Sequence, residues 1–382
     1  MSTTRRQFLA TTATVTTAAM VPYFGWQKKT LADESQSKND RVSIGLIGAG
    51  GMGLGNLRAA AQWIDVVAIA DPAPAAAKLA ESRGLEAFTD AESMLSKTDV
   101  DAVIIATPTE RHHADLMMVL KYRKTVLVEK PITATTKEAY EVTNYAAEQG
   151  CQVLVGHQRR YYPCAQIARD IIQNGQIGRL MAVSGQWTTR KDEDYFAPAW
   201  RRNFEAGPIL TNLIHEIDLL RFICGDIASV SAEMTNHDQN FEKEDAVAIS
   251  LKFANQAVGS FLLSDRTPSP WTWEMALGES VKFPKTGMNS IRFLGVQGAL
   301  EFPNLVLWKH SDDNGDWHQE IVPEVIEAPF IDAYVAQCEH LRAVARGYET
   351  PIVDALNGSR SLDATLAAAR AATGGKRIQL SN

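Results

Sequence analysis

The chain has 382 residues, of which 45% are hydrophobic and 22% charged, and its formal net charge is -7 at pH 7. This length and apolar content predict a globular protein with a large core and room for two domains. An acidic chain without a basic stripe argues against a nucleic-acid partner, and four cysteines without a C-x-x-C pair argue against a disulfide framework or a zinc site.

The first forty residues differ from the rest of the chain. Arg5 and Arg6 precede Phe8 and Leu9, and the threonine- and alanine-rich stretch that follows is too short and too weakly apolar to span a bilayer. This pattern is typical of a twin-arginine export signal, and a disordered basic tail is the alternative. We therefore assign residues 1–40 to a signal and linker, and expect export to the bacterial periplasm with no membrane span in the mature protein.

A strand, a glycine-rich turn and an amphipathic helix are expected next, within residues 42–60. Gly48, Gly50 and Gly53 match G-x-G-x-x-G, in which the first glycine allows a tight turn. The second lets a pyrophosphate approach the backbone, and the third lets helix and strand pack closely. A dinucleotide-binding βαβ unit is predicted, and its cofactor contacts are expected to include Gly51 and Met52 as well.

The second strand of this unit ends at Asp71, about twenty residues after the glycines, where the dinucleotide motif places an acid. Its carboxylate is expected to accept hydrogen bonds from the adenosine ribose and to repel a 2′-phosphate. This favours NAD over NADP as the cofactor. Capping of the following helix is the alternative role, and one carboxylate can do both.

Three more short apolar runs, at residues 101–108, 124–131 and 151–158, alternate with amphipathic helical segments. This alternation predicts a parallel, doubly wound sheet, in which ligands bind beyond the carboxyl ends of the strands. Side chains at those ends are expected on the cofactor side of the sheet: Thr107, Pro108, Glu129, Lys130 and Gln158.

Four segments in this order, GLIGAGGMG, ATPTERH, VLVEKPI and VGHQRRYYP, together resemble the Gfo/Idh/MocA family. The likeness extends to AWRRNFEAGPILTNLIHEIDLLRFICG, which is similar to the family segment ending in H-x-x-D on a helix. The resemblance implies an α/β protein with a Rossmann domain at residues 41–160. A C-terminal α+β domain at 161–382 would then have an open, mainly antiparallel sheet, with the final helices packing back on the body. Strand-like runs agree with this, at residues 179–190, 229–236, 246–253, 257–265 and 291–298.

The resemblance also implies the catalytic groups. Lys130 would hold the substrate oxygen and His215 would take the hydroxyl proton, with Asp218 orienting the His215 ring from the same helix face. The family usually has an aspartate four residues before the histidine, where this chain has Thr211. The neighbouring Asn212 is a candidate for orienting the substrate, and capping of the helix by these two residues is the open alternative.

Three further residues occupy family positions. His112 would lie near the nicotinamide ribose, and Trp200 with Arg201 would reach toward the cofactor, although a packed tryptophan is the alternative. His215 and Asp218 alone are too few ligands for a metal, so none is expected.

The leading hypothesis is an exported oxidoreductase with tightly bound NAD that acts on a sugar, polyol or cyclitol. The first alternative is a glycosidase that uses bound NAD for transient oxidation, elimination and re-reduction. The second is a non-catalytic protein that binds sugar and NAD, which the missing aspartate would suit. Relatives of this kind often pair through the open sheet, so a homo-oligomer, dimer or tetramer, is expected.

Overall fold

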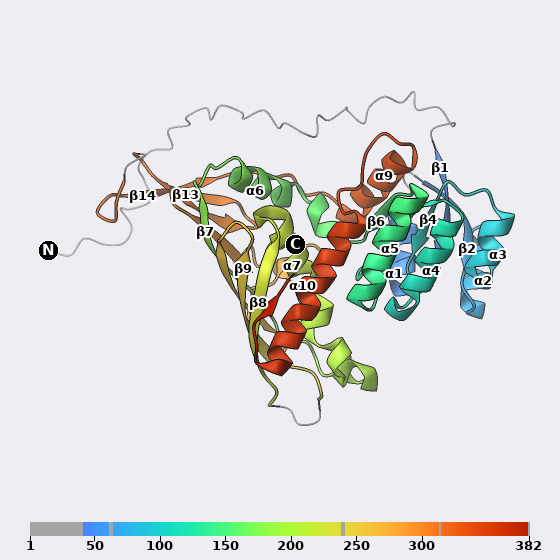
Figure 1. Ribbon diagram of the computed structural model, residues 1–382, viewed down its shortest axis with the longest axis horizontal. Helices are drawn as coiled ribbons and strands as arrows, with labels where there is room; N and C mark the ends of the chain where they lie inside the picture. The colour runs from blue at the N-terminus through green and yellow to red at the C-terminus, as the bar shows by residue number, and fades with distance from the viewer. Residues whose placement is uncertain (1–40, 61–63, 238–240, 313–314, 381–382) are drawn as a thin grey trace. The chain divides into compact units, whose positions relative to one another are not determined.

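The computed structural model describes residues 41–60, 64–237, 241–312 and 315–380, and the chain from Arg41 onward forms one compact unit (Figure 1). The predicted export signal lies outside the described residues. Two sheets organise the described part, one with six strands and one with nine. The predicted α/β fold, with a parallel sheet followed by a second sheet, is confirmed.

The first sheet is entirely parallel and has the order β3-β2-β1-β4-β5-β6. Its strands are β1 Val42–Ile47, β2 Ile64–Ala70, β3 Glu86–Phe88, β4 Ala102–Ile105, β5 Thr125–Val128 and β6 Val153–Val155. The connecting helices are α1 Gly51–Ala60, α2 Pro74–Ser82, α3 Ala91–Lys97, α4 Thr109–Lys121 and α5 Thr136–Gln149. The strand order reverses between β1 and β4, and such a switch point creates the crevice in which a dinucleotide binds.

Local sequence signals explain where these helices begin and end. Helix α5 starts with a capping box, in which the side chains of Thr135 and Glu138 each accept a hydrogen bond from the other's backbone N–H. It ends at Gly150, which adopts the left-handed conformation with φ of 66°. Helix α3 is capped by Asp90, whose carboxylate accepts from the Ser93 N–H.

The second sheet has the order β14-β13-β12-β11-β7-β10-β9-β8-β15. Its strands are β7 Leu180–Thr188, β8 Ile227–Thr235, β9 Ala246–Phe253, β10 Val258–Ser264, β11 Ile291–Gly295, β12 Ala299–Phe302, β13 Val306–His310, β14 Ile321–Val325 and β15 Ile378–Gln379. Strands β7 and β10 pair in parallel, and the other described neighbours pair antiparallel. The mainly antiparallel sheet is confirmed; the last four strands were not predicted.

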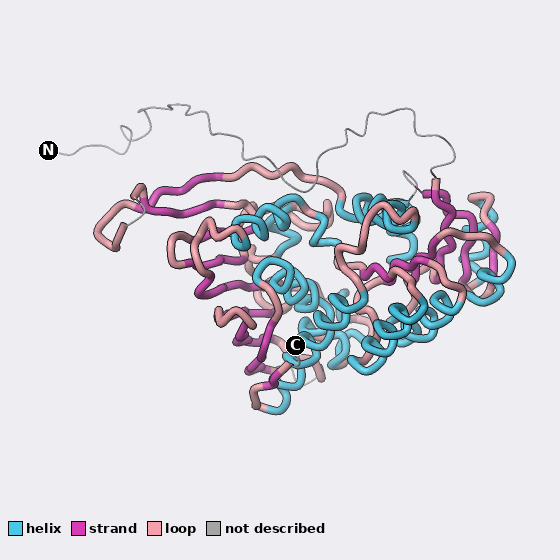
Figure 2. The backbone as a smooth tube through the Cα atoms, turned by 45° about the horizontal axis from the view of Figure 1, so that its top comes forward, coloured by secondary structure: helices cyan, strands magenta, loops and turns pink. Residues whose placement is uncertain are grey.

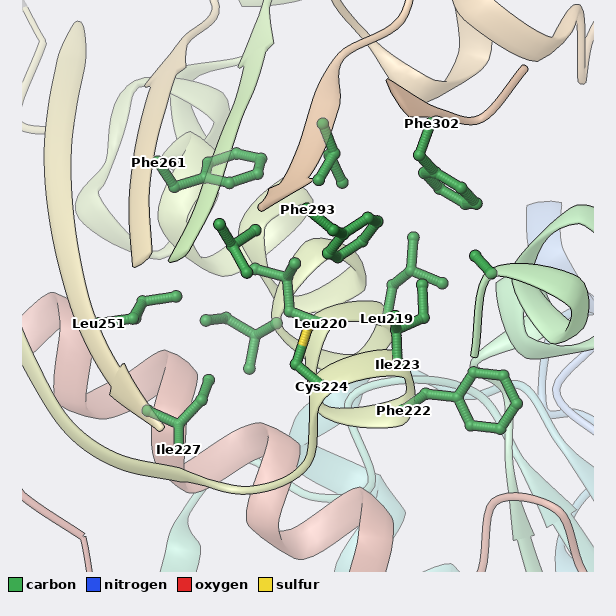
Figure 3. Close-up of a cluster of buried hydrophobic side chains, with 14 of the residues drawn as sticks. Leu219, Leu220, Phe222, Ile223, Cys224, Ile227, Leu251, Phe261, Phe293 and Phe302 are labelled. Atoms are coloured by element: carbon green, nitrogen blue, oxygen red, sulfur yellow. The ribbon is translucent and has the colours of Figure 1, made fainter. Parts of the chain in front are cut away.

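Helices α6 Pro163–Gln173, α7 Ile214–Cys224 and α10 Ala355–Gly374 lie on one face of this sheet (Figures 1 and 2). Along β10 the side chains alternate, with Phe261 and Leu263 buried while Val258 and Leu262 are exposed. Figure 3 shows the buried face, where strand residues such as Phe261 and Phe293 meet α7. Helix α7 is therefore fixed by the core of the second sheet.

The two last long helices attach the end of the chain to both sheets. Helix α9, Ala333–Ala345, contacts α1 and contributes Cys338, Leu341 and Val344 to the core around β1 and β2. Helix α10 packs against α5, α7 and β8. The position of α7 relative to the first sheet is thus held by contacts from α10 on both sides.

Candidate functional site

The glycine loop after β1 has both close packing and open space. At Gly48, where φ is 86°, an added Cβ would lie 2.8 Å from the carbonyl of Ala106, and at Gly53 it would lie 2.1 Å from the Gly48 oxygen. At Gly50 and Gly51 an added Cβ would meet no atom within 4 Å. The backbone that begins α1 thus faces open space. The loop fits the pyrophosphate of a dinucleotide, which helix N–H groups bind.

Asp71 connects this loop to the start of α2. Its Oδ2 accepts a 2.8 Å hydrogen bond from the Ala49 N–H, and its Oδ1 accepts one of 2.8 Å from the Ala73 N–H. The N-cap position of α2 is Ala73, so Asp71 supports the turn before the helix but is not its N-cap. Each oxygen keeps acceptor capacity, and the partly exposed carboxylate is able to bind a ribose.

His112 ties two loops of the first sheet together. Its Nδ1 lies 2.7 Å from the Pro131 oxygen and its Nε2 lies 2.9 Å from the Thr107 oxygen, and the side chain is buried. Both ring nitrogens therefore contact backbone oxygens, and a position of His112 near the nicotinamide ribose stays a prediction. Thr107 donates to Asp115 at 2.8 Å, which fixes the same loop, and Pro108 directly precedes α4.

Glu129 and Lys130, adjacent at the end of β5, have different surroundings. Glu129 is buried, accepts a 2.7 Å hydrogen bond from Asn56 of α1, and has a pKa raised by burial. Its carboxylate therefore joins α1 to β5. The Lys130 ammonium has one hydrogen bond among the described residues, a long one of 3.5 Å to the Thr211 oxygen. Burial lowers the pKa of Lys130, while the Glu129 carboxylate opposes this shift.

Thr211 and Asn212 lie in a π-helical turn, Ile209–Leu213, that leads directly into α7. Leu213, at the N-cap position of α7, already has helical backbone angles, so the capping alternative for Thr211 and Asn212 is wrong. The Thr211 hydroxyl lies 2.9 Å from the Gly207 oxygen, and the Asn212 side-chain oxygen accepts from Lys191 at 3.3 Å. Such π-helical turns are frequent at functional sites because they displace the backbone locally.

His215 occupies the first turn of α7. Its Nδ1 is buried and has no hydrogen-bond partner within the described part of the chain. Burial lowers the pKa of His215 well below its ordinary value, and the positive charges of Lys130 and Arg159 lower it further. The imidazole is therefore neutral at neutral pH, as a base that accepts a hydroxyl proton must be.

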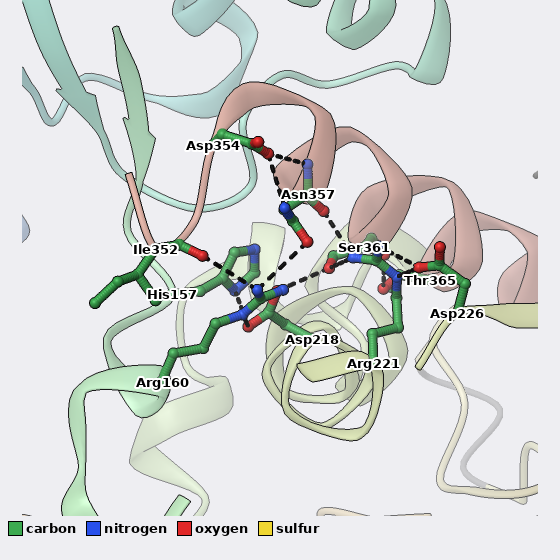
Figure 4. Close-up of polar contacts among 10 residues, drawn as sticks. All are labelled: His157, Arg160, Asp218, Arg221, Asp226, Ile352, Asp354, Asn357, Ser361 and Thr365. Carbon is green, nitrogen blue, oxygen red and sulfur yellow. Dashed lines mark hydrogen bonds and ion pairs between the residues drawn. The ribbon is translucent and has the colours of Figure 1, made fainter. Parts of the chain in front are cut away.

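Asp218 does not hydrogen-bond to His215, which corrects the predicted orienting contact. Its two oxygens accept from Arg160 at 2.8 and 2.6 Å, and the Ser361 hydroxyl donates at 2.8 Å (Figure 4). Burial alone would raise the pKa of Asp218, but the Arg160 guanidinium holds it below its ordinary value. The carboxylate is thus committed to a buried ion pair between η2, Gln158–Tyr161, and α7.

Several charged residues beside the site were missed from the sequence. Arg159 forms ion pairs with Glu216 and with Glu274, the latter at 3.0 Å, while Lys191 lies 3.4 Å from Asp265. The paired arginines in VGHQRRYYP were the available signal, because charged residues directly after a buried strand need partners. For Lys191 and Asp265 no sequence signal existed, since they come from separate loops of the second sheet.

The remaining predicted cofactor residues have protein partners or exposed positions. Gln158 donates to Glu279 at 3.4 Å. The Arg201 guanidinium lies 4.3 Å from the Tyr195 ring centre, and it donates a 2.9 Å hydrogen bond to the backbone carbonyl oxygen of Tyr195. Trp200 is 59% exposed, which rules out the packed alternative, and Met52 is 43% exposed beside the glycine loop.

The described residues hold neither a metal-binding cluster nor a membrane-spanning helix. No group of three or more His, Cys, Asp or Glu side chains is placed to hold a metal ion. Within the same ranges, no helix is long and apolar enough to cross a membrane.

Comparison with known proteins defines the class of the chain. Residues 42–157 match the oxidoreductase family with an NAD-binding Rossmann fold, and residues 165–301 match the C-terminal domain of the same group. The protein is therefore an oxidoreductase with an NAD-binding domain. It belongs to the Gfo/Idh/MocA family.

Individual relatives agree with this assignment. The rhizopine catabolism protein MocA of Rhizobium meliloti is 31% identical over 188 residues, which are 48% of this chain and 58% of the relative. The scyllo-inositol 2-dehydrogenase (NAD(+)) of Bacillus subtilis is 25% identical over 350 residues, 89% of this chain and 96% of the relative. A levoglucosan dehydrogenase solved with NADH and levoglucosan shares the fold, with a TM-score of 0.74 at 19% identity over 90% of this chain and 100% of that one.

Proposed function

We propose that the protein is an NAD-dependent dehydrogenase that transfers a hydride between a ring carbon of a sugar or cyclitol and the nicotinamide. The observation that carries this proposal is the pair Lys130 and His215. The Lys130 ammonium reaches the Thr211 oxygen at 3.5 Å, one helical turn before His215, and has no other hydrogen bond among the described residues. Two polar groups with spare hydrogen-bonding capacity thus lie near the carboxyl end of β5, where α/β proteins bind their ligands, and the Lys130 charge acts on His215.

Each residue would have one task in the reaction. NAD+ supplies the hydride acceptor. Lys130 would donate a hydrogen bond to the substrate oxygen and stabilise the charge that develops there. His215, neutral and partly exposed, would take the hydroxyl proton at Nε2, since its Nδ1 points into the protein.

The names of the relatives support a ring-shaped polyol as the substrate. Inositol is a cyclic polyol and levoglucosan is a bicyclic sugar, and both relatives are dehydrogenases. NAD, and not NADP, is the proposed cofactor, because the Asp71 carboxylate would repel a 2′-phosphate.

We further propose that the protein is exported with NAD tightly bound and that it forms a homo-oligomer. The twin arginine at residues 5 and 6 supports export. An exported enzyme needs a retained cofactor, because no free NAD pool exists outside the cytoplasm. Exposed apolar side chains on β7, β10 and β11 support pairing through the uncovered sheet face, among them Met181, Val258, Leu262 and Leu294.

The test is the ultraviolet spectrum of the purified protein with its cofactor, before and after addition of inositols, monosaccharides and glycosides. Growth of the NADH absorbance with one of the cyclic polyols is the expected result. Release of an aglycone without net NADH would favour the glycosidase chemistry. No spectral change with any of these compounds would contradict the proposal and favour a binding protein.

A further inference from the structure

A second histidine lies on the inner side of His215. His157 follows β6 and is 1% exposed, and neither of its ring nitrogens has a hydrogen-bond partner in the described part of the chain. Its ring lies edge-on to the His215 ring, with the centroids 6.3 Å apart. Buried polar groups are nearly always hydrogen-bonded, so two neighbouring histidines with unpartnered nitrogens need an explanation.

Asp218 is the charged group next to His157. Nδ1 of His157 lies 3.9 Å from Oδ2 of Asp218, and Figure 4 shows the ring beside the Arg160–Asp218 pair. This separation is too long for a hydrogen bond but short enough for attraction once the imidazole is charged. The site therefore has a series of three groups leading inward: His215, His157 and Asp218.

The surroundings favour a proton on the inner of the two histidines. Burial lowers the pKa of His215, and the neighbouring charges of Lys130, Arg159 and His157 lower it further. Burial also lowers the pKa of His157, to about 4, and Arg160, Lys130 and Arg221 act in the same direction. Only His157 has an opposing partner, the Asp218 carboxylate.

We propose that His157 receives the proton that His215 removes from the substrate hydroxyl, so that Asp218 acts on the reaction through His157. This inference rests on the proposed function and adds a positioning residue to it. The series would replace the carboxylate that is missing at Thr211.

The proton transfer balances without a further reactant. The substrate carbon loses a hydride to NAD+, and its hydroxyl proton goes to Nε2 of His215. The proton on Nδ1 of His215 then passes to His157, which leaves His215 neutral. The 6.3 Å between the rings excludes a direct bond, so one bridging water would carry this proton. The proton leaves by the reverse path after the product has dissociated.

The test is His157→Gln, which keeps hydrogen-bonding groups but does not bind a proton at neutral pH. Turnover is expected to fall roughly 10-fold or more, with KM unchanged. The acidic limb of the kcat profile should move to lower pH, because a proton-binding group beside Asp218 has been removed. The matched control is His340→Gln, at a buried histidine that pairs with Glu349 at 2.6 Å, and it should change neither quantity.

Two kinetic results would overturn the inference. One is wild-type turnover in His157→Gln. The other is reduced turnover with an unmoved acidic limb, because a packing role would lower activity without changing proton affinity.

Histidine NMR of the unaltered protein gives a reading that does not depend on activity or on the folding of a variant. As the pH falls, the His157 ring should take up a proton before the His215 ring, and the opposite order overturns the inference. A protein that forms no NADH with any sugar would refute the proposed function, whereas active protein with His215 protonating first would refute only the role of His157.

Discussion

His215 and Asp218, about one turn apart on α7, differ in how fully they are hydrogen-bonded. Asp218 has both oxygens occupied by Arg160 and Ser361, whereas His215 has an unpartnered Nδ1 and adjoins Lys130, whose ammonium has one long hydrogen bond among the described residues. Saturated buried networks fix structure, and groups with spare capacity are available to a ligand. The difference indicates that His215 is available to a ligand, whereas the direct contacts of Asp218 hold the structure together.

The architectural network extends beyond Asp218. Arg160 also donates to the Ile352 oxygen at 3.3 Å, and Arg221 donates to the Ser361 hydroxyl at 2.7 Å (Figure 4). These bonds join the end of the first sheet, α7 and α10. Because they set the position of α7, they also set where His215 lies relative to Lys130.

The largest expected effect is the loss of turnover when Lys130 or His215, the residues with spare hydrogen-bonding capacity, is replaced. Lys130→Ala and His215→Ala should each lower turnover by a factor on the order of 10² to 10⁴, the usual contribution of a positioned acid or base. Neither change breaks a short hydrogen bond, so folding and bound NAD should persist, as measured by circular dichroism and by cofactor content. Near-normal turnover of Lys130→Ala on the true substrate would make this lysine a structural charge at a strand end.

Replacing Asp218, whose carboxylate is fully hydrogen-bonded, is expected to lower the stability of the fold. Asp218→Asn leaves Arg160 buried without its countercharge and should cost about 3–5 kcal/mol in the free energy of unfolding, measured by urea denaturation. The matched control is Asp65→Asn, in the exposed pair with Arg41, which should cost about 0–1 kcal/mol. Equal losses of unfolding free energy in the two variants would contradict the view that the buried ion pair contributes more than the exposed one.

The pH dependence of stability has a defined sign. The pKa of Asp218 is lowered in the folded protein, so its pair stabilises the fold above the ordinary aspartate value of about 4. This contribution should decline as the pH falls below that value through the folded pKa. The difference in stability between wild type and Asp218→Asn should shrink in the same range.

A smaller effect is expected at the cofactor. Asp71→Ser removes a ribose contact and a repulsive charge together, so NAD should bind roughly 10-fold more weakly and the bias against NADP should relax. Because Asp71 also accepts from the backbone of Ala49 and Ala73, a modest loss of stability should accompany this change. Titration with both dinucleotides is the measurement. Equal affinities of the wild type for NAD and NADP would defeat the assignment.

The smallest effect is expected at the π-helical turn. Thr211→Asp and Thr211→Asn both disturb the contact with the Gly207 oxygen and should cost about 1 kcal/mol of stability. Only the aspartate adds a charge near His215, which should move the acidic limb of the kcat profile to higher pH by favouring the imidazolium. The same profile in both variants would mean that Thr211 faces away from the site.

The first sheet could be predicted from the sequence because its signals are local. Most of its strands are short, largely buried runs. The glycines after β1 stand where the backbone packs closely, as at Gly48 beside Ala106. Of the four strands that were missed in the second sheet, β14 is exposed along its whole length and β15 has only two residues. Such strands are defined by their partners and have little apolar alternation of their own.

The site was only partly predictable for a related reason. The positions of Lys130 and His215 follow from motifs, but their partners come from distant segments. The spacing of Asp218 suggested a contact with His215, yet its carboxylate meets Arg160, 58 residues away in the chain. The contacts of His112 could not be predicted either, because a motif does not reveal that both ring nitrogens lie beside backbone oxygens.

In the proposed reaction Lys130 and His215 act together on one proton transfer, and a double-mutant cycle measures whether they do. Turnover of Lys130→Ala, His215→Ala and the double variant would be measured with the best substrate of the panel. The double variant should lose much less turnover than the product of the two single losses, because either change already disables the same step. Losses that multiply, with fold and NAD content intact, would contradict it.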